Sequence, residues 1–206
     1  MNFPSMRLRP IALLPLLIFI GLLAGCAPVA DDAVTNSSSA SSSVPSGSDD
    51  EALLVYFSND VLNPGAADCS AVFPVTRSIA ETEDKPLAAM RELFRGPTDE
   101  EKTAGYSSFF SGETADAIKS VRIENATAYV DLEDIRSIIP NASSSCGSAS
   151  LLSQIESTLK ELPGVDRVIL AIDGDPAAFY DWLQIGCSPE NDQCDSAPFR
   201  NGDEQR

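Results

Sequence analysis

The chain has 206 residues, with 14 basic side chains, 31 acidic side chains and no histidine, and its formal net charge is −17 at pH 7. A surface this acidic repels phosphate groups, which excludes nucleic acid as a partner and disfavours anionic lipid headgroups. Because histidine is absent, the chain lacks the commonest general base and the commonest transition-metal ligand. Hydrolysis by a Ser-His-Asp or Cys-His group is therefore excluded by composition.

The first 26 residues have the pattern of an export signal. Arg7 and Arg9 precede an apolar run over residues 11–24, which is shorter than the roughly 20 residues that span a bilayer as a helix. A charged start, a short apolar middle and a small-residue exit are typical of a cleaved signal peptide. The run ends in Leu23-Ala24-Gly25-Cys26, which resembles the lipobox of bacterial lipoproteins. We therefore predict a signal peptide over residues 1–25 and attachment of lipid, including palmitate-type acyl chains, at Cys26.

Residues 26–50 are rich in Ser, Ala, Asp, Gly and Pro, and a nearly continuous serine run occupies residues 37–43. Such a segment buries too little apolar surface to offset the entropy that it would lose on ordering. We predict a flexible linker that separates the folded part from the membrane. The lipid would place the protein at the cell membrane, on its extracytoplasmic side, with the membrane contacted through the lipid.

The folded part is predicted over residues 51–186, a length that suits one hydrophobic core. The apolar run 53–57 predicts a strand, and residues 72–77 predict a second strand. Pro74 cannot donate to a strand ladder, which indicates an edge strand or a bulge there. Residues 85–94 have apolar side chains at helical spacing. Thr98 and Glu101 then have capping-box spacing for a further helical turn, although an acidic recognition loop would use the same residues.

Residues 118–132 alternate apolar and polar side chains around Glu124-Asn125, which predicts a β-hairpin. An amphipathic helix is predicted over residues 148–162, and the apolar run 165–172 is typical of a strand at the centre of its sheet. The order of elements indicates an α+β fold: one small domain with a mixed or antiparallel sheet and two main helices packed on one face. Residues 187–206 are polar and acidic, and we expect a loose tail outside a small cysteine loop.

The order and spacing of these stretches resemble the GerMN domain, the sporulation and spore germination domain that also occurs in other bacterial lipoproteins. The matching stretches are Leu54-Val55-Tyr56-Phe57, Phe73 to Ile79, Ala88 to Leu93 with Gly96-Pro97-Thr98-Asp99-Glu100-Glu101, Gly105 to Ser108, Ile118 to Glu124, Ala128 to Leu132, Gln154-Ile155 with Leu159, and Val168 to Gly174.

This resemblance implies an α+β interaction module without a catalytic group. We therefore expect a membrane-anchored, extracytoplasmic lipoprotein that is not an enzyme and acts as a protein-interaction or assembly module of the cell envelope, with envelope proteins as partners. Members in spore formers carry two such domains in tandem, whereas this chain has one, which puts a sporulation role in doubt. The alternative is a lipoprotein that binds a small ligand or a cell-wall fragment.

Besides Cys26, the chain has four cysteines: Cys69, Cys146, Cys187 and Cys194. An even number in an exported protein suggests disulfides, and three connectivities are possible. We favour Cys187–Cys194, which closes a small loop, and Cys69–Cys146, which joins two distant segments; free buried thiols are the alternative. A zinc site would normally show Cys-x-x-Cys pairs, and the chain has none. We therefore predict no metal and no cofactor.

Two acidic groups follow predicted strands. Asp173, Asp175 and Asp181 have oxygen ligands of the kind that calcium prefers, but they lack the spacing of a calcium loop, so that a turn is favoured. The second group, Asp131, Glu133 and Asp134, could serve a hydrolase only if two carboxyls faced each other across a cleft. No catalytic residue is predicted.

An aromatic cluster follows the last predicted strand: Phe179, Tyr180 and Trp182. Aromatic side chains are frequent in the energetic centres of protein interfaces, which makes the cluster a possible contact with a partner. The alternative is that the three side chains cover the core.

Overall fold

The computed structural model describes residues 50–81, 84–189 and 192–200. The predicted signal peptide, Cys26 and nearly all of the predicted linker lie outside these ranges. Within them, no helix is long and apolar enough to cross a membrane.

The first sheet is antiparallel and has the order β2-β1-β3, with β1 at Asp50–Asn59, β2 at Phe73–Ala80 and β3 at Tyr106–Ser107. Along β1 the side chains of Leu53, Val55 and Phe57 are buried, while their neighbours are more exposed, because alternate residues of a strand point to opposite faces. The strand β2, which contains Pro74, lies at the edge of the sheet, as its sequence predicts.

The second sheet has the order β4-β5-β6, with β4 at Ile118–Glu124, β5 at Thr127–Leu132 and β6 at Arg167–Ile172. The first two strands form the predicted hairpin, and β6 runs parallel to β5. The hairpin turn lies at Asn125-Ala126, one residue later than predicted. Both residues have positive φ angles, 48° and 59°, as a two-residue hairpin turn with the matching twist requires.

Five α-helices and one short 3₁₀ helix complete the described part of the fold. They are α1 at Lys85–Phe94, α2 at Asp99–Thr103, α3 at Ser145–Lys160, α4 at Pro176–Trp182, α5 at Ala197–Arg200 and the 3₁₀ helix η1 at Pro64–Ala66. The helix α1 has the predicted bounds. At α2 the capping box of Thr98 and Glu101 is complete, as predicted.

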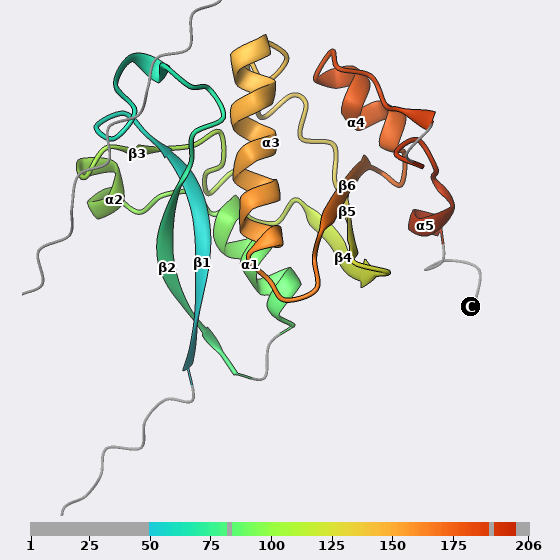
Figure 1. Cartoon of the computed structure of the whole chain (residues 1–206), viewed down its shortest axis with the longest axis horizontal. Coiled ribbons are helices and arrows are strands. Elements are labelled where there is room, and N and C mark those ends of the chain that lie inside the picture. Colours follow the sequence, from blue (N-terminus) through green and yellow to red (C-terminus); the bar gives the residue numbers. More distant parts are fainter. Residues whose placement is uncertain (1–49, 82–83, 190–191, 201–206) are drawn as a thin grey trace, which may run out of the picture. The chain divides into compact units, whose positions relative to one another are not determined.

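The layers explain why the strands form two sheets instead of the single sheet predicted from sequence. The helices α1 and α3 lie between the sheets and contact both (Figure 1). At the open edge of β1, the N–H of Tyr56 donates to Thr158 Oγ1 of α3 at 3.0 Å, so that a helix occupies the place of a further strand. The α+β class is confirmed, with two three-stranded sheets on either side of the two main helices.

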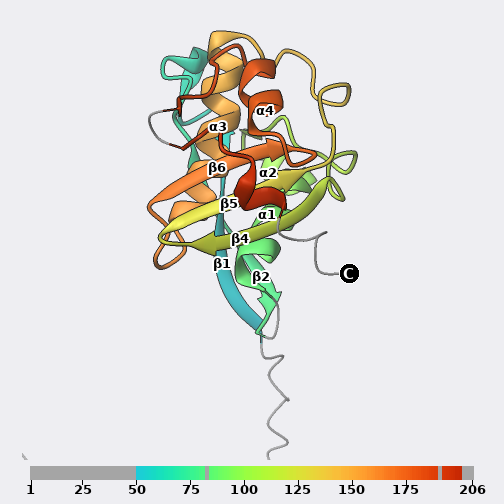
Figure 2. The same ribbon diagram turned by 90° about the vertical axis from the view of Figure 1, so that its right-hand side faces the viewer.

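The strand β6 lies at an edge of its sheet and not at the centre. Its residues are apolar because they are covered by α3 on the inner side of the sheet and by α4, which lies beyond the free edge of β6 (Figure 2). The free edge is closed by polar contacts: the N–H of Leu170 donates to the Tyr180 hydroxyl at 3.2 Å, and that of Ile172 donates to the Asp175 carbonyl at 3.1 Å.

Candidate functional site

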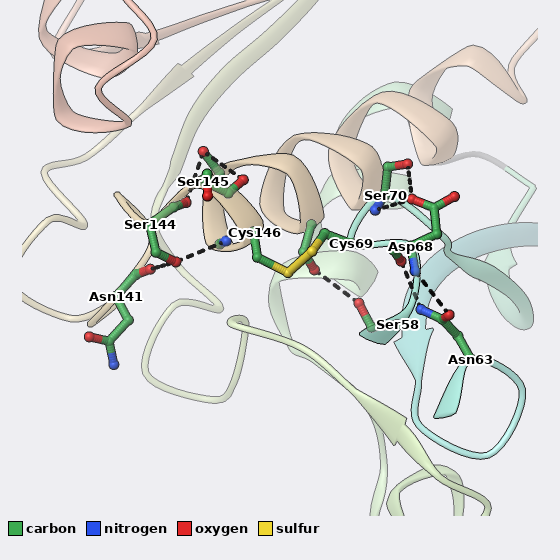
Figure 3. The surroundings of a disulfide bond; sticks show 12 residues. Ser58, Asn63, Asp68, Cys69, Ser70, Asn141, Ser144, Ser145 and Cys146 are labelled. Carbon is green, nitrogen blue, oxygen red and sulfur yellow. Dashed lines mark hydrogen bonds between the residues drawn. A yellow bond between two sulfur atoms is a disulfide. The ribbon is translucent and has the colours of Figure 1, made fainter. Parts of the chain in front are cut away.

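A cavity of about 400 Å³ lies beside the disulfide between Cys69 and Cys146, whose Cα atoms are 5.1 Å apart. The disulfide joins the loop after β1 to the first turn of α3 (Figure 3). Four segments surround the cavity: the end of β1, the loop over residues 60–71, residues 107–109 and the start of α3. We call this site the disulfide cavity. Its volume is within the usual range for small-molecule sites.

The start of α3 is built by local hydrogen bonds. Ser144 is the N-cap, and its hydroxyl accepts the N–H of Gly147 at 3.0 Å and donates to the carbonyl of Asn141 at 3.1 Å. A side chain at Gly147 would collide with that carbonyl, so that glycine is required there. Because a serine N-cap is available at position 144, the helix begins at Ser145, earlier than the predicted position 148.

The loop after β1 is held by the side chain of Asn59, which is only 3% exposed. Its Oδ1 atom accepts the N–H groups of Val61 and Leu62, at 2.9 and 3.0 Å, and its Nδ2 atom donates to the carbonyl of Ala104 at 3.3 Å. Val61 and Leu62 are nevertheless 70% and 57% exposed. A buried amide thus fixes the backbone of an exposed apolar pair in the loop whose neighbouring residues, Asp60 and Asn63, line the disulfide cavity.

Four polar side chains form a chain of hydrogen bonds along the cavity floor. Ser108 Oγ donates to Gln154 Oε1 at 2.6 Å, and Gln154 Nε2 donates to Ser150 Oγ at 3.2 Å. Ser150 in turn shares a hydrogen bond with Ser58, with 3.0 Å between the hydroxyl oxygens. Gln154 is fully buried, which makes this network part of the fold as well as of the cavity wall.

Asp60 and Asp68 are the ionisable side chains that line the cavity. Asp68 accepts hydrogen bonds from the hydroxyl and the N–H of Ser70, and these bonds lower the pKa of its carboxyl below the ordinary value. No lining residue is a lysine or an arginine, and none of the serines there is paired with a general base. The cavity can therefore bind a molecule, and its lining has no base-paired serine of the kind that serves as a nucleophile.

The second acidic group does not form facing carboxyls. Asp131 is 9% exposed and accepts the N–H of Gly174 at 2.7 Å, and burial raises the pKa of its carboxyl. Asp134 instead pairs with Arg136, whose hydrogen bonds lower the pKa of Asp134 to about 2.

The favoured turn at Asp173-Gly174 is confirmed. Asp173 is paired with Lys119 at 2.9 Å. Asp175 caps α4 by accepting the N–H of Ala177 at 2.9 Å.

The aromatic cluster belongs largely to the core. Phe179 and Tyr180 are fully buried, and Trp182 is half-buried with its ring edge-on to Phe179 at 5.9 Å between centroids. Phe179 and Tyr180 cannot touch a partner from these positions, so the interpretation of the cluster as an exposed anchor is corrected for both. Both side chains belong to the hydrophobic core, and the Tyr180 hydroxyl accepts the N–H of Leu170 at the free edge of β6, where α4 packs.

The second disulfide joins Cys187 to Cys194, with 5.4 Å between Cα atoms. Within the described residues after it, α5 packs on β5, where Phe199 lies edge-on to Tyr129 at 5.7 Å, so that the prediction of a loose tail is wrong for residues 197–200. We call residues 173–189 and 192–200 the C-terminal cap.

Sequence reasoning missed Asn59, the exposed pair Val61–Leu62 and the floor residues Ser58 and Gln154. Two adjacent apolar residues between turn formers were the available signal for the pair.

The profile of the sporulation and spore germination family, Germane, matches residues 54–178. A structure of the tandem GerMN domains of the sporulation protein GerM from Bacillus subtilis is 22% identical to the chain, with a TM-score of 0.44. That match covers 65% of this chain and 42% of the tandem structure. A crystal structure of a candidate lipoprotein from Clostridium perfringens is 20% identical, with a TM-score of 0.33, and the match covers 60% of this chain and 75% of that one. No curated protein matches the chain.

Proposed function

Because the chain belongs to the sporulation and spore germination (Germane) domain family, we propose that it is a lipid-anchored, non-catalytic interaction module of the cell envelope. The family resemblance seen in the sequence is thereby confirmed. The chain spans 42% of the tandem GerM structure, and we do not extend a sporulation role to it. The lipobox-like sequence at Cys26 and the family match support an anchored binding function.

The direction of β1 supports a particular presenting surface. The strand begins at Asp50 and ends at Asn59, next to the disulfide cavity, so that its ten residues separate the two ends by about 30 Å. Figure 1 shows the start of β1 at the bottom and the loop after it at the top. A chain tethered through Cys26 enters the domain at the start of β1, and the loop with Val61 and Leu62 lies at the opposite end.

The observation that carries the proposal is the pair Val61–Leu62. Large apolar side chains that stand in solvent cost free energy unless something covers them, and the buried amide of Asn59 fixes both of their N–H groups. A preordered apolar pair loses little conformational entropy on binding, which favours contact with a protein partner. The partner would be an envelope protein within reach of this end of the domain.

In-cell photocrosslinking tests the presenting surface. A photoreactive amino acid at Leu62 should give discrete adducts with an envelope protein. The same amino acid at Ser78, which is exposed on β2 opposite Ala52 near the linker end, is the matched control. Identical adducts from both positions, or none from Leu62, would contradict the proposal.

The tether has a separate test. In Cys26→Ala the acceptor thiol is missing, so that a fatty-acid probe should no longer label the protein and the lipoprotein peptidase should leave the precursor uncleaved. Labelling that persists in this variant would rule out Cys26 as the attachment site. Loss of the Leu62 adducts in the same variant would show that the tether positions the contact.

A further inference from the structure

The disulfide cavity has two kinds of polar group in different places. Asp60 and Asp68, at the loop side, offer only acceptor oxygens when ionised. Elsewhere in the lining, the half-buried pair Ser58–Ser150 retains a donor, because only one of the two hydroxyl hydrogens has an acceptor among the described residues. A molecule in this cavity is therefore offered both acceptors and a donor.

Charge narrows the ligand class. With two carboxylates and no cationic side chain in its lining, the cavity disfavours phosphates, carboxylates and other anions. The edge of β1 excludes an extended peptide that would add as a strand, because Ser58 and Asn59 are already paired with β3.

Part of the cavity wall is apolar, although asparagines and serines also line it. Phe109, Ala66 and Ala71 line the cavity together with the disulfide. A neutral sugar ring has hydroxyls that both donate and accept, and its C–H faces suit apolar walls.

From these complementary groups we infer that the disulfide cavity is a binding site for a neutral saccharide. The ring hydroxyls donate to the carboxylates of Asp60 and Asp68 and accept from the hydroxyl that remains free in the Ser58–Ser150 pair. The disulfide holds the two walls together, since Cys69 lies on the loop and Cys146 on α3 (Figure 3). This site does not depend on the lipid at Cys26, and it lies at the same end of the domain as Val61 and Leu62.

Saturation-transfer NMR on the purified chain, with its disulfides intact, tests the site. The probe is N-acetyl-D-glucosamine at millimolar concentration. Its cationic analogue D-glucosamine and the anion glucose 6-phosphate are compared under the same conditions. We expect transfer to the neutral sugar and much weaker transfer to the anion. No transfer to the neutral sugar, or stronger transfer to either charged sugar, would overturn the inference.

Two variants locate the binding. Ala71→Phe fills the cavity from its apolar wall and should abolish the signal. Asp60→Ala removes a carboxylate that has no hydrogen-bond partner in the described part of the chain, and it should weaken binding about tenfold, the effect of losing a charged acceptor. The matched control is Asp116→Ala, an exposed carboxylate outside the cavity lining.

Unchanged binding in Ala71→Phe would place the sugar elsewhere. Equal weakening in Asp60→Ala and Asp116→Ala would show a general charge effect. Either result overturns the assignment to this cavity. Because Asp60→Ala leaves the hydrogen bonds of the fold intact, its result stands even if Ala71→Phe fails to fold.

Discussion

The disulfide cavity and the C-terminal cap are both closed by a disulfide, but the two crosslinks act over different lengths of chain. Cys69 and Cys146 are separated by 77 residues, and their bond joins a loop to the start of a central helix. Cys187 and Cys194 are 7 residues apart, and their bond closes a loop within the cap. The first crosslink restricts the unfolded chain far more than the second. The cavity is therefore held by a crosslink between distant segments of the domain, and the cap by a crosslink within one short segment.

The largest effect is expected from removing the long-range disulfide. The double variant Cys69→Ser/Cys146→Ser should lose about 4.5 kcal/mol of unfolding free energy, because the unfolded chain regains the entropy of a 77-residue loop. Denaturant titration measures the loss. Since small domains have about 5–15 kcal/mol in total, this variant should be close to unfolding. If this variant lost less unfolding free energy than Cys187→Ser/Cys194→Ser, which removes the disulfide of the cap, the first crosslink would not be the more stabilising one.

The next effect is expected from the buried ion pair between β2 and α2. Arg77 of β2 donates to both carboxylate oxygens of Glu101 in α2, and it lies 3.5 Å from Glu92. The side chains of Arg77 and Glu101 are only 12% and 14% exposed. Removal of one partner leaves a buried charge uncompensated, so that Arg77→Met should cost about 3 kcal/mol in thermal or chemical unfolding.

The control for this ion pair is Arg95→Ala. Arg95 also pairs with Glu92, but its side chain is 61% exposed, and its loss should cost less than about 1 kcal/mol. Similar losses in Arg77→Met and Arg95→Ala would show that burial does not strengthen the first pair.

The disulfide of the cap should contribute less to the free energy of unfolding. In Cys187→Ser/Cys194→Ser the released loop has 7 residues, and the expected loss of unfolding free energy is about 2.4 kcal/mol. Hydrogen exchange should show greater opening of α5 and the adjoining loop, with the inner strands still protected. Equal loss of protection at β1 and α3 would contradict a local role for this crosslink.

The smallest effect is a difference in the pH dependence of stability between variants at Asp131, beside the cap, and at Glu101, in α2. Burial raises the pKa of Asp131, beside the cap, so that its contribution to stability is present at low pH and lost as pH rises through the folded-state pKa. Asp131→Asn, which keeps an oxygen for the Gly174 N–H, should therefore gain up to about 1 kcal/mol at pH 7 and nothing at pH 3. Melting curves at the two pH values measure the gain.

The contribution of Glu101 to stability should depend on pH in the opposite direction to that of Asp131. The hydrogen bond from Arg77 lowers the pKa of Glu101, so that its contribution is present above the unfolded-state pKa and lost as pH falls through the folded-state pKa. Glu101→Gln should therefore lose stability at pH 7 and little at low pH. For each variant, the change in unfolding free energy on mutation is followed against pH. If this change varied with pH in the same direction in Asp131→Asn and Glu101→Gln, the expected electrostatic difference would be refuted.

Much of the local structure could be predicted from the sequence. The helix α1 has its predicted bounds because apolar spacing, Pro86 and a following Gly96 act together over ten residues. The edge position of β2 follows from the missing N–H of Pro74. The capping box of α2 depends on two side chains three residues apart. In each case the cause lies within a few residues of the element.

The predictions that were wrong or missing concern contacts between residues that are far apart in the sequence. The apolar run of β6 suggested a central strand. An apolar run shows that its residues are buried, but it does not show whether strands or helices bury them. The aromatic residues of α4 gave no sign of which side faces inward. The disulfide cavity combines segments near residues 60, 108 and 146, and nothing local brings Ser58 to Ser150.

The sequence by itself therefore determined the family, the α+β class and the main helices and strands, and it predicts the export signal and the lipid attachment at Cys26. These features depend on composition and on short periodic patterns. Only the tertiary structure decided that the strands divide into two sheets, that Phe179 and Tyr180 are buried, and that Gln154 and Asp60 line the same cavity. These features arise from packing between segments far apart in the chain, where burial and long-range hydrogen bonds outweigh local preference.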